Sequence, residues 1–187
     1  MNCQPHVFWL FGLSGAGKST LAAALRRDLS NTLDATPLML DGDRLRNGLS
    51  RGLGFSEADR AENLRRAAEV ARLGVESDQV VIAAFITPRE ENRRMIEQVV
   101  GADLVSLIHV DASLDICQRR DAKGLYARAV AGTLPQMTGV SASFDVPSRF
   151  ALRLETGVES PEISAEKLLK FARKRLDGPE ARQAAVV

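Results

Sequence analysis

The chain carries the segment Gly12-Leu13-Ser14-Gly15-Ala16-Gly17-Lys18-Ser19 directly after the apolar run Val7 to Phe11. This segment matches the pattern G-x-x-x-x-G-K-[ST], which forms a P-loop when it lies between a strand and a helix. A helical pattern with Leu21, Ala24 and Leu25 follows it, so both neighbours are present. The segment therefore predicts a phosphate-binding loop near the start of an α/β fold.

The residue types of this loop suit a nucleoside triphosphate. Glycines let successive backbone N–H groups turn toward a phosphate chain, and the N-terminus of the following helix adds the positive end of its dipole. Lys18 supplies a cation for the β- and γ-phosphates. Ser19 offers a hydroxyl to a Mg²⁺ ion that bridges those phosphates.

Length and composition place the chain among ordinary globular proteins. It has 187 residues, of which 45% are hydrophobic and 26% are charged. Lys and Arg number 25 and Asp and Glu number 24, so the formal charge of +1 gives no overall field for nucleic acid or an anionic membrane. We expect one domain over residues 1–187, with no nucleic-acid or membrane partner, in which a local site binds any anion.

Cysteine usage and the N-terminal residues indicate a reducing compartment. Cys3 and Cys117 are too few for a disulfide framework, and neither has a Cys-x-x-Cys partner. The apolar run Val7 to Phe11 is shorter than the core of a signal peptide, and Met1 to Pro5 carries no Lys or Arg. We therefore expect a cytoplasmic location.

Short apolar runs alternate with longer helical patterns, which is typical of βαβ units. One helix is expected to begin at Ser56, which can form a capping box with Asp59, and another to cover Leu168 to Leu176. The fold class is therefore α/β, a P-loop NTPase-like three-layer fold with a parallel five-stranded sheet flanked by helices and a lid. The candidate strands are Val7 to Phe11, Leu38 to Leu40, Val80 to Phe85, Leu104 to Val110 and Leu152 to Leu154.

Two further regions lack a clear periodicity. From Asp121 to Pro147, glycine, proline and serine interrupt every regular pattern, and so long a connection predicts a functional lid over residues 121–147. Gly178-Pro179 is a stop signal for the last helix, and residues 178–187 are expected to fray.

An acidic pair ends the second candidate strand. Asp41-Gly42-Asp43 lies where the carboxyl edge of the sheet is expected, and ligands bind at that edge in open α/β sheets. Asp41 is the candidate catalytic acid, because it could accept the proton of an acceptor hydroxyl or orient a water on Mg²⁺. The alternatives are a turn built on Asp-Gly and, for Asp43, a cap on the next helix.

The P-loop alone does not identify a reaction. A GTPase needs the guanine-reading motif N-K-x-D, which the sequence lacks, and the D-x-x-G at Asp121 to Gly124 lies too far downstream for a switch. An ABC-type signature is missing as well. Phosphoryl transfer to a small molecule is therefore the default expectation.

The motifs that follow the P-loop point to one family. They are Leu40-Asp41-Gly42-Asp43, Arg46 with Gly48-Leu49, Leu53-Gly54-Phe55-Ser56, Asp59-Arg60, Glu62-Asn63, Val81 to Ile86, Arg120-Asp121 and Lys123-Gly124-Leu125-Tyr126. Together with the loop they resemble the adenylylsulfate kinase (APS kinase) family, which phosphorylates the 3′-hydroxyl of adenosine 5′-phosphosulfate (APS) to give PAPS. The resemblance implies ATP and Mg²⁺ as cofactors and APS as the small-molecule substrate. It also implies a possible homodimer and a possible association with ATP sulfurylase.

The resemblance further implies a role for each matching residue. Catalysis would involve Lys18, Asp41, Lys123 and Thr87, and the metal ligands would be Ser19 and Asp41. The ATP-binding residues would be Gly12, Leu13, Ser14, Gly15, Ala16, Gly17, Lys18, Ser19, Thr20 and Arg120. The substrate-binding residues would be Asp43, Arg46, Phe55, Arg60, Asn63, Ile86, Thr87, Lys123, Leu125 and Phe144.

The chemistry of these side chains agrees with the implied roles. Guanidinium groups can meet phosphosulfate oxygens in bidentate fashion, which suits Arg46 and Arg60. Phe55 would stack on the acceptor adenine, and Lys123 would neutralise charge on the transferring phosphoryl group. The other interpretations are a solvated helix face for Arg60, a core aromatic for Phe55 and a solvated loop lysine for Lys123.

Some positions depart from the family pattern. Arg44 replaces the usual Asn, and Thr87-Pro88 replaces Ser-Pro. Glu90, with Arg89 beside it, replaces an Arg. In the lid, Met137 replaces a Phe, and the family's Asp-Ser-Pro-Tyr-Glu becomes Ser141-Ala142-Ser143-Phe144-Asp145. The loss of one aromatic stacking partner costs only about 0.5–1.5 kcal/mol, so Met137 should weaken acceptor binding without abolishing it.

A few residues receive only structural interpretations. His6 is expected at the surface, His109 in the core as a satisfied histidine, and Cys117 buried on a helix. The basic residues of the last helix are expected to form a solvated face, with partner docking as the alternative; they are Lys167, Lys170, Arg173, Lys174 and Arg175.

Three hypotheses for function remain. The first is an ATP-dependent APS kinase. The second is a related kinase acting on another nucleotide-linked small molecule, because the departures cluster at the acceptor and the lid. The third is a low-turnover nucleotide-binding module that partners a sulfate-activating enzyme.

Overall fold

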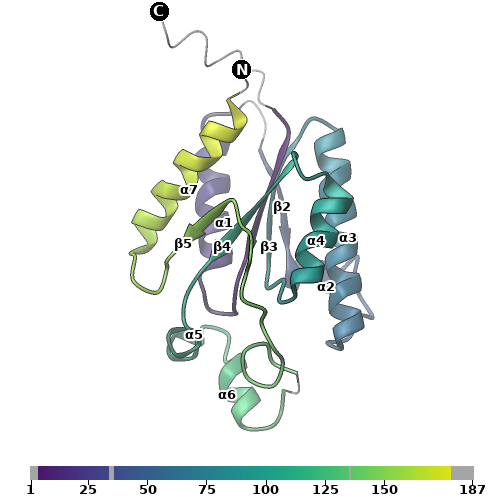
Figure 1. Cartoon of the computed structure of the whole chain (residues 1–187), viewed down its shortest axis with the longest axis vertical. Helices are drawn as coiled ribbons and strands as arrows, with labels where there is room; N and C mark the ends of the chain where they lie inside the picture. Colours follow the sequence, from purple (N-terminus) through teal and green to yellow (C-terminus); the bar gives the residue numbers. More distant parts are fainter. Residues whose placement is uncertain (1–3, 34–35, 135, 178–187) are drawn as a thin grey trace, which may run out of the picture.

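A parallel sheet forms the centre of the protein, whose computed structural model describes residues 4–33, 36–134 and 136–177 (Figure 1). Its strand order is β2-β3-β1-β4-β5. The α/β prediction and all five predicted strands are confirmed, with single-residue differences at some strand ends. The strands are β1 (His6–Phe11), β2 (Leu38–Asp41), β3 (Val80–Phe85), β4 (Val105–Val110) and β5 (Leu152–Leu154).

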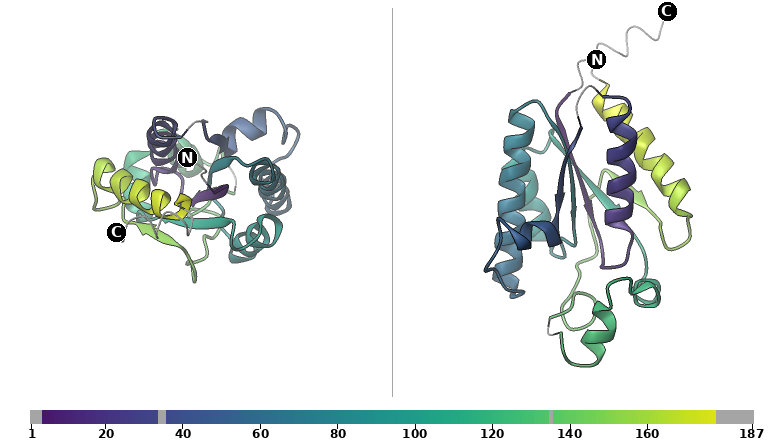
Figure 2. Two further views of the ribbon diagram at one scale, coloured as in Figure 1. Left: turned by 90° about the horizontal axis from the view of Figure 1, so that it is seen from above. Right: turned by 180° about the vertical axis from the view of Figure 1, so that it is seen from behind.

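Helices cover both faces of the sheet and make three layers. The helices α1 and α7 lie on one face, and α3 and α4 lie on the other (Figures 1 and 2). The bounds are α1 (Lys18–Ser30), α2 (Gly42–Asn47), α3 (Glu57–Glu76), α4 (Glu90–Val100), α5 (Leu114–Arg120), α6 (Leu125–Val130) and α7 (Pro161–Leu176).

Strand β1 is buried on both faces because it is the middle strand. Phe8 and Leu10 pack into the core beneath α1 and α7, while Trp9 and Phe11 pack into the core beneath α3 and α4. This alternation follows from the two-residue period of a strand. Each large apolar side chain so buried contributes about 1.5–3 kcal/mol to stability, so β1 anchors the loop that follows it.

The helix α3 begins as the sequence predicts. The Asp59 backbone N–H donates to Ser56 Oγ at 3.1 Å, which makes Ser56 the N-cap. The second half of the capping box differs from the usual form, because the Asp59 carboxylate accepts from the Ser56 hydroxyl at 2.7 Å. The start of α3, next to the acceptor residues, is therefore fixed by a local contact.

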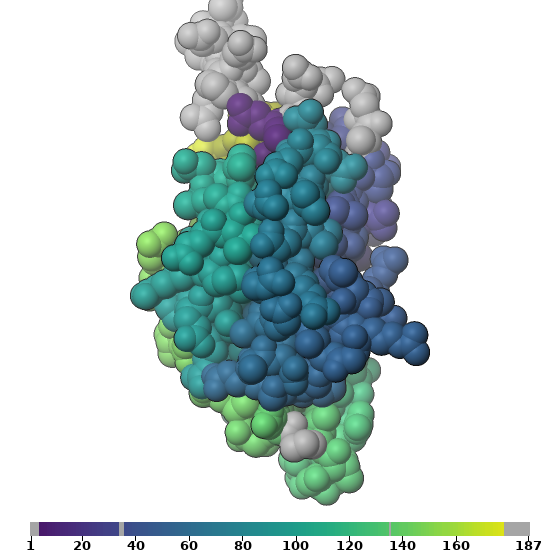
Figure 3. Space-filling view, turned by 90° about the vertical axis from the view of Figure 1, so that its right-hand side faces the viewer, coloured from purple at the N-terminus to yellow at the C-terminus, as the bar shows by residue number. Residues whose placement is uncertain are grey.

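The predicted lid region lies beyond the carboxyl ends of the strands. It contains the short helix α6 and an isolated bridge between Thr138 and Ala142. Figure 3 shows it projecting below the face formed by α3 and α4. Cys3, the stop signal Gly178-Pro179 and the tail 178–187 lie outside the described residues. Within the described ranges, no helix combines the length and apolar character needed to cross a bilayer.

Two structural expectations outside the site are confirmed, and a third agrees with the structure. His109 is buried and stacks on Phe11 with ring centroids 5.1 Å apart. Cys117 is buried as a free thiol. The basic residues of α7 are exposed, as a solvated face requires.

The surface interpretation of His6 is wrong. His6 is the first residue of β1 and only 5% exposed, and its Nε2 lies 2.8 Å from Ser106 Oγ on the adjacent strand. Sequence position misled here, because the strand begins one residue earlier than the apolar run. Burial, together with the positive charge of Arg175, lowers the pKa of His6 to about 4.

We expect the protein to lose stability as the pH falls from about 6.5 to about 4. The folded-state pKa of His6 is lowered, so the unfolded state takes up the proton first and folding becomes less favourable in that window. Urea unfolding of the wild type and His6→Gln at several pH values measures this, since glutamine can still bond Ser106 but does not titrate. His109, whose pKa burial also lowers, should leave part of the slope. An equal slope in both proteins would contradict the role of His6.

Candidate active site

A cavity of about 680 Å³ opens at the carboxyl ends of β1, β2 and β3. The chain after β1 enters α1 on one face of the sheet, and the chain after the adjacent strand β3 enters α4 on the other face. Ligands bind at such a point in open α/β folds. The cavity is lined by segments from the P-loop, α2, the start of α3, the loop after β3 and the lid. It therefore brings the predicted donor and acceptor residues to one place.

The P-loop conformation depends on its glycines. Gly12 has φ +148°, and a Cβ there would lie 2.2 Å from the Val110 carbonyl oxygen, so no larger residue fits. Gly17 has φ +103° and caps α1 without a side-chain bond. A Cβ on Gly17 would meet no atom within 4 Å, so the space in front of the helix N-terminus is open. This cradle fits a phosphate chain.

Lys18 is buried beneath the loop. Its Nζ donates to the Leu13 carbonyl oxygen at 2.7 Å. Burial lowers the pKa of Lys18 to about 8, against smaller raising effects from nearby acidic groups. The ammonium is thus held at the floor of the cradle with little solvent around it, where an anionic ligand would favour its charged form.

At pH 8, we expect ATP binding to be accompanied by net proton uptake. The pKa of Lys18 is about 8 in the ligand-free protein, and phosphate charge beside the amine should raise it. Titration calorimetry in two buffers of different ionisation enthalpy measures the uptake, which should fade at about pH 6.5 because Lys18 is already protonated there. The control is Lys18→Met, and an equal uptake by that variant would contradict the assignment.

Asp41 makes two contacts at the end of β2. One carboxylate oxygen accepts from the Asp43 backbone N–H at 3.0 Å, which makes Asp41 the N-cap of α2. The other accepts from Ser19 Oγ at 3.1 Å. The idea that Asp43 caps α2 is therefore wrong, because Asp43 lies inside the first turn. Two hard oxygen donors next to the cradle are the kind of ligand that suits Mg²⁺.

The acceptor side contains two arginines around one aromatic ring. The Arg46 guanidinium carbon lies 4.5 Å from the Phe55 ring centroid and that of Arg60 lies 6.0 Å from it. Phe55 is 54% exposed, so the core interpretation of its ring is not supported. Burial and then the charge of Arg46 lower the pKa of Arg60, because each disfavours a second guanidinium cation at this place.

The remaining polar residues of this side also face the cavity. Asn63 is 5% exposed, and its Oδ1 has no hydrogen-bond partner among the described residues. A buried amide oxygen without a partner costs free energy unless a ligand supplies a donor. Thr87 is buried, and its Oγ1 accepts from Trp9 Nε1 at 3.0 Å. Ile86 and Leu125 contribute apolar wall.

Lid residues already contact the acceptor side. Lys123 forms an ion pair with Asp43 across the cavity. Arg60 donates to Thr138 Oγ1 at 2.7 Å and to the Gln136 carbonyl oxygen. The solvated interpretation of Arg60 is therefore not supported, because its side chain bridges the two walls. The side chain of Lys123 stays 55% exposed in its ion pair, so its role at the transferring phosphoryl group stays a prediction.

Arg120 lies on the donor side. Its guanidinium donates to the carbonyl oxygens of Gly15 at 3.3 Å and Thr156 at 2.5 Å. Two residues with no role predicted from the sequence support the loop from the same direction. Tyr126 Oη donates to the Ser14 carbonyl at 3.0 Å, and Thr156 Oγ1 donates to the Ala16 carbonyl at 2.7 Å. Tyr126 ends the family motif that begins at Lys123, whereas no sequence signal marks Thr156, which acts through a backbone atom of the loop.

Phe144 is the one predicted acceptor residue that lies away from the others. It does not line the cavity, and it is half-buried against the α3 and α4 side of the core. Its ring lies 6.3 Å from His109 and 5.8 Å from the Arg93 guanidinium carbon. Phe144 is therefore a packing residue at the end of the lid region and not part of the cavity wall.

Comparisons with known proteins agree with this geometry. A profile of the adenylylsulphate kinase family matches residues 4–155. An adenylyl-sulfate kinase of Bacteroides thetaiotaomicron is 43% identical over 91% of this chain and 85% of its own length. The bifunctional enzyme NodQ of Rhizobium tropici is 44% identical over 94% of this chain, which spans only 28% of NodQ.

A solved structure shows the same arrangement of elements. The Mycobacterium tuberculosis APS kinase CysC in complex with AMPPNP and APS superposes with a TM-score of 0.85 at 37% identity, covering 91% of this chain and 99% of that one. Profile, sequence and structure each cover most of the chain and agree on one group of kinases. With its P-loop, acidic strand end and paired arginines in family order, this chain belongs to the adenylylsulphate kinase family.

Proposed function

We propose that the protein transfers the γ-phosphoryl group of ATP to the 3′-hydroxyl of APS, giving PAPS and ADP. The observation that carries this proposal is the position of Arg46, Phe55 and Arg60 across one cavity from the P-loop. An adenine ring on Phe55, with phosphosulfate oxygens on the two guanidinium groups, would use the aromatic face and the positive charge together.

The chain's own groups support a direct transfer. The 3′-oxygen bonds to the γ-phosphorus as the bond to the oxygen shared with ADP breaks, and the hydroxyl proton passes to the Asp41 carboxylate. Lys18 stays protonated and stabilises the charge that shifts to the leaving phosphate. Lys123, from the lid, approaches the same oxygens after it leaves Asp43.

The residues also fit a Mg²⁺ ion. Ser19 Oγ and the Asp41 carboxylate lie 3.1 Å apart beside the cradle, and Mg²⁺ in kinases takes few protein oxygens and completes its shell with phosphates and water. Bound there, Mg²⁺ would supply neutralisation of phosphate charge. Ser19 and Asp41 are the groups that would hold it.

Product formation with different acceptors tests the proposal. Purified protein is incubated with MgATP and either APS or diphosphate derivatives of cytidine or guanosine, and ADP release and PAPS are measured. We expect turnover with APS above that with the other acceptors. Equal turnover with all of them would favour a kinase for another nucleotide-linked molecule. ATP binding without product over hours would favour the low-turnover binding module.

Three further proposals concern the protein's surroundings. We propose a homodimer, an association with ATP sulfurylase and a cytoplasmic location. The family resemblance supports the first two. The association also agrees with the chemistry, because APS must be supplied by an enzyme that joins sulfate to ATP. The free, buried thiol of Cys117 agrees with reducing surroundings. Light scattering of the purified protein, alone and with a sulfurylase, measures both associations.

A further inference from the structure

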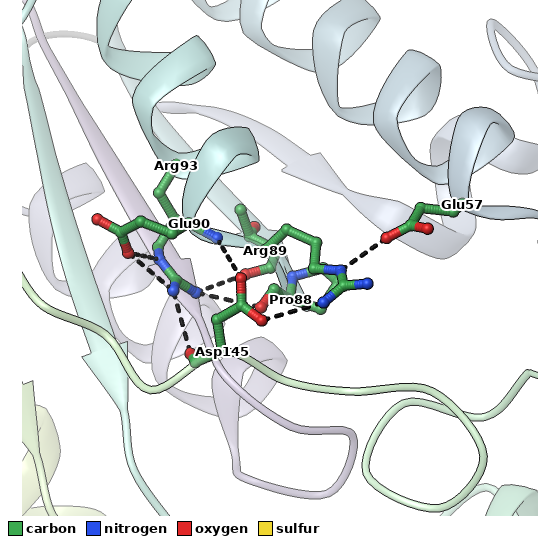
Figure 4. A network of polar contacts seen from close by, with 7 residues as sticks. Glu57, Pro88, Arg89, Glu90, Arg93 and Asp145 are labelled. Atoms are coloured by element: carbon green, nitrogen blue, oxygen red, sulfur yellow. Dashed lines mark hydrogen bonds and ion pairs between the residues drawn. The ribbon is translucent and has the colours of Figure 1, made fainter.

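A buried arginine on α4 joins the loop after β3 to the end of the lid (Figure 4). Arg93 is 1% exposed and is among the largest fully buried side chains of the described residues. Its guanidinium donates to the Glu90 carboxylate at 2.9 Å and to the carbonyl oxygens of Thr87 at 3.1 Å, Pro88 at 3.4 Å and Asp145 at 3.0 Å.

Such a group is a costly way to fill space. Burying a charged guanidinium costs several kcal/mol unless it is paired and fully hydrogen-bonded, and an apolar side chain of similar size often gives equal or greater stability. Here the Glu90 carboxylate balances the charge, while the rings of Phe11 and Phe144 lie 5.2 and 5.8 Å from the guanidinium carbon. What Arg93 provides beyond packing is a fixed fork of donors that joins two segments distant in sequence.

The first segment is the acceptor wall of the cavity. Thr87 has φ +45°, a left-handed conformation that is costly for a β-branched residue and is kept only where the surroundings hold it. It is held at both ends, because Arg93 binds its carbonyl oxygen and Trp9 Nε1 binds its hydroxyl. Thr87 and Pro88 both line the cavity, so Arg93 fixes the position of that wall.

The second segment is the end of the lid. The Asp145 carboxylate accepts from the Glu90 backbone N–H at 3.0 Å and from Arg89 at 3.2 Å, and its own N–H donates to the Pro88 carbonyl at 2.8 Å. The helix α4 has no cap from its own N-cap side chain, so Asp145 supplies that contact from a distant segment. Arg89 extends the network to Glu57 at the start of α3, at 2.6 Å.

We propose that Arg93 is a positioning residue for acceptor binding, which holds the Thr87-Pro88 wall and the Asp145 end of the lid in one arrangement. The proposal rests on the proposed function only in naming APS as the acceptor. The donor side is held mainly by other contacts, from Arg120, Tyr126 and Thr156. The P-loop meets the loop after β3 through Gly12, whose N–H donates to the Ile86 carbonyl at 3.2 Å, and not through Arg93 itself. Loss of Arg93 should therefore affect the acceptor and leave ATP binding in place.

The test compares Arg93→Met and Arg93→Lys with a control, Arg94→Met. Arg94 is on the same helix, but its side chain is 71% exposed. We expect the KM for APS to rise about tenfold in Arg93→Met and less in Arg93→Lys, which keeps the charge but not the planar fork. The KM for ATP should stay within about twofold in all three variants. Asp145→Asn, which weakens the same junction from the lid side, should raise the KM for APS in the same direction if Arg93→Met does not fold.

Trp9 gives a second readout, because it is the one tryptophan of the sequence and bonds Thr87. Its emission should differ from the wild type in ligand-free Arg93→Met and Arg93→Lys, and stay unchanged in Arg94→Met. Equal changes in both KM values, or no change in either, would overturn the proposal. If the wild type does not phosphorylate APS, the proposed function fails. In that case, unchanged Trp9 emission in both Arg93 variants would separately overturn the positioning role of Arg93.

Discussion

Replacement of Lys18 by alanine is expected to lower kcat/KM by about 10² to 10³-fold. The ammonium lies at the floor of the phosphate cradle, where a low-dielectric surrounding makes its charge most effective. Its removal weakens phosphate binding and leaves the charge on the transferring phosphoryl group without its nearest cation. Steady-state kinetics with MgATP and APS measures the loss.

We expect the same variant to lose activity without losing thermal stability. Lys18 is held in the buried state at a cost, as its pKa of about 8 shows, so Lys18→Ala should unfold at the same temperature as the wild type or higher. The matched control is Lys170→Ala on the exposed side of α7, which should change neither property. A kcat/KM of Lys18→Ala within about threefold of the wild type would remove Lys18 from the mechanism.

Replacement of Arg60 by alanine is expected to raise the KM for APS about 10- to 100-fold with a smaller change in the KM for ATP. Charge-assisted hydrogen bonds contribute about 1.5–3 kcal/mol each, and Arg60 is the group that reaches both the acceptor side and the lid. Initial rates at varied APS and fixed saturating ATP measure the effect.

A control on the same helix shows whether the effect of Arg60→Ala comes from its position at the cavity or from the loss of one positive charge. Arg65 lies on α3 with its side chain 48% exposed and paired with Glu62, so Arg65→Ala removes an equal charge away from the cavity. Its KM for APS should match the wild type. An unchanged KM in Arg60→Ala, or an equal rise in both variants, would take Arg60 out of the acceptor site.

Most of the fold could be predicted from local patterns. Strands such as β3 are continuous apolar runs, and the P-loop gives the start of α1, because both depend on residues adjacent in sequence. The lid was harder to predict, since α6 is short and its shape depends on contacts with distant parts of the chain. His6 shows the same limit at a strand end, where its burial depends on Ser106 of the neighbouring strand.

The site residues were predicted from the order of the family motifs. The residues that support them were not predicted. Tyr126 and Thr156 support the loop through backbone oxygens, which no residue pattern encodes. Phe144 was expected at the acceptor because the family pattern has an aromatic residue there, but its ring packs against the core beside His109. The role of Arg93 could not be predicted from the sequence. A basic residue in a polar helix pattern is expected to be solvated, and the burial of Arg93 depends on contacts with a distant segment.

Three cationic side chains of the cavity already have partners within the protein. Lys123 holds Asp43, Arg60 holds the lid at Thr138, and Lys18 holds the carbonyl of Leu13. Substrates therefore enter by exchange, and the observed affinity is the difference between the new contacts and the old ones. An anion that offers fewer oxygens than the contacts it displaces gains little, so we expect inorganic sulfate and other small oxyanions to bind weakly here.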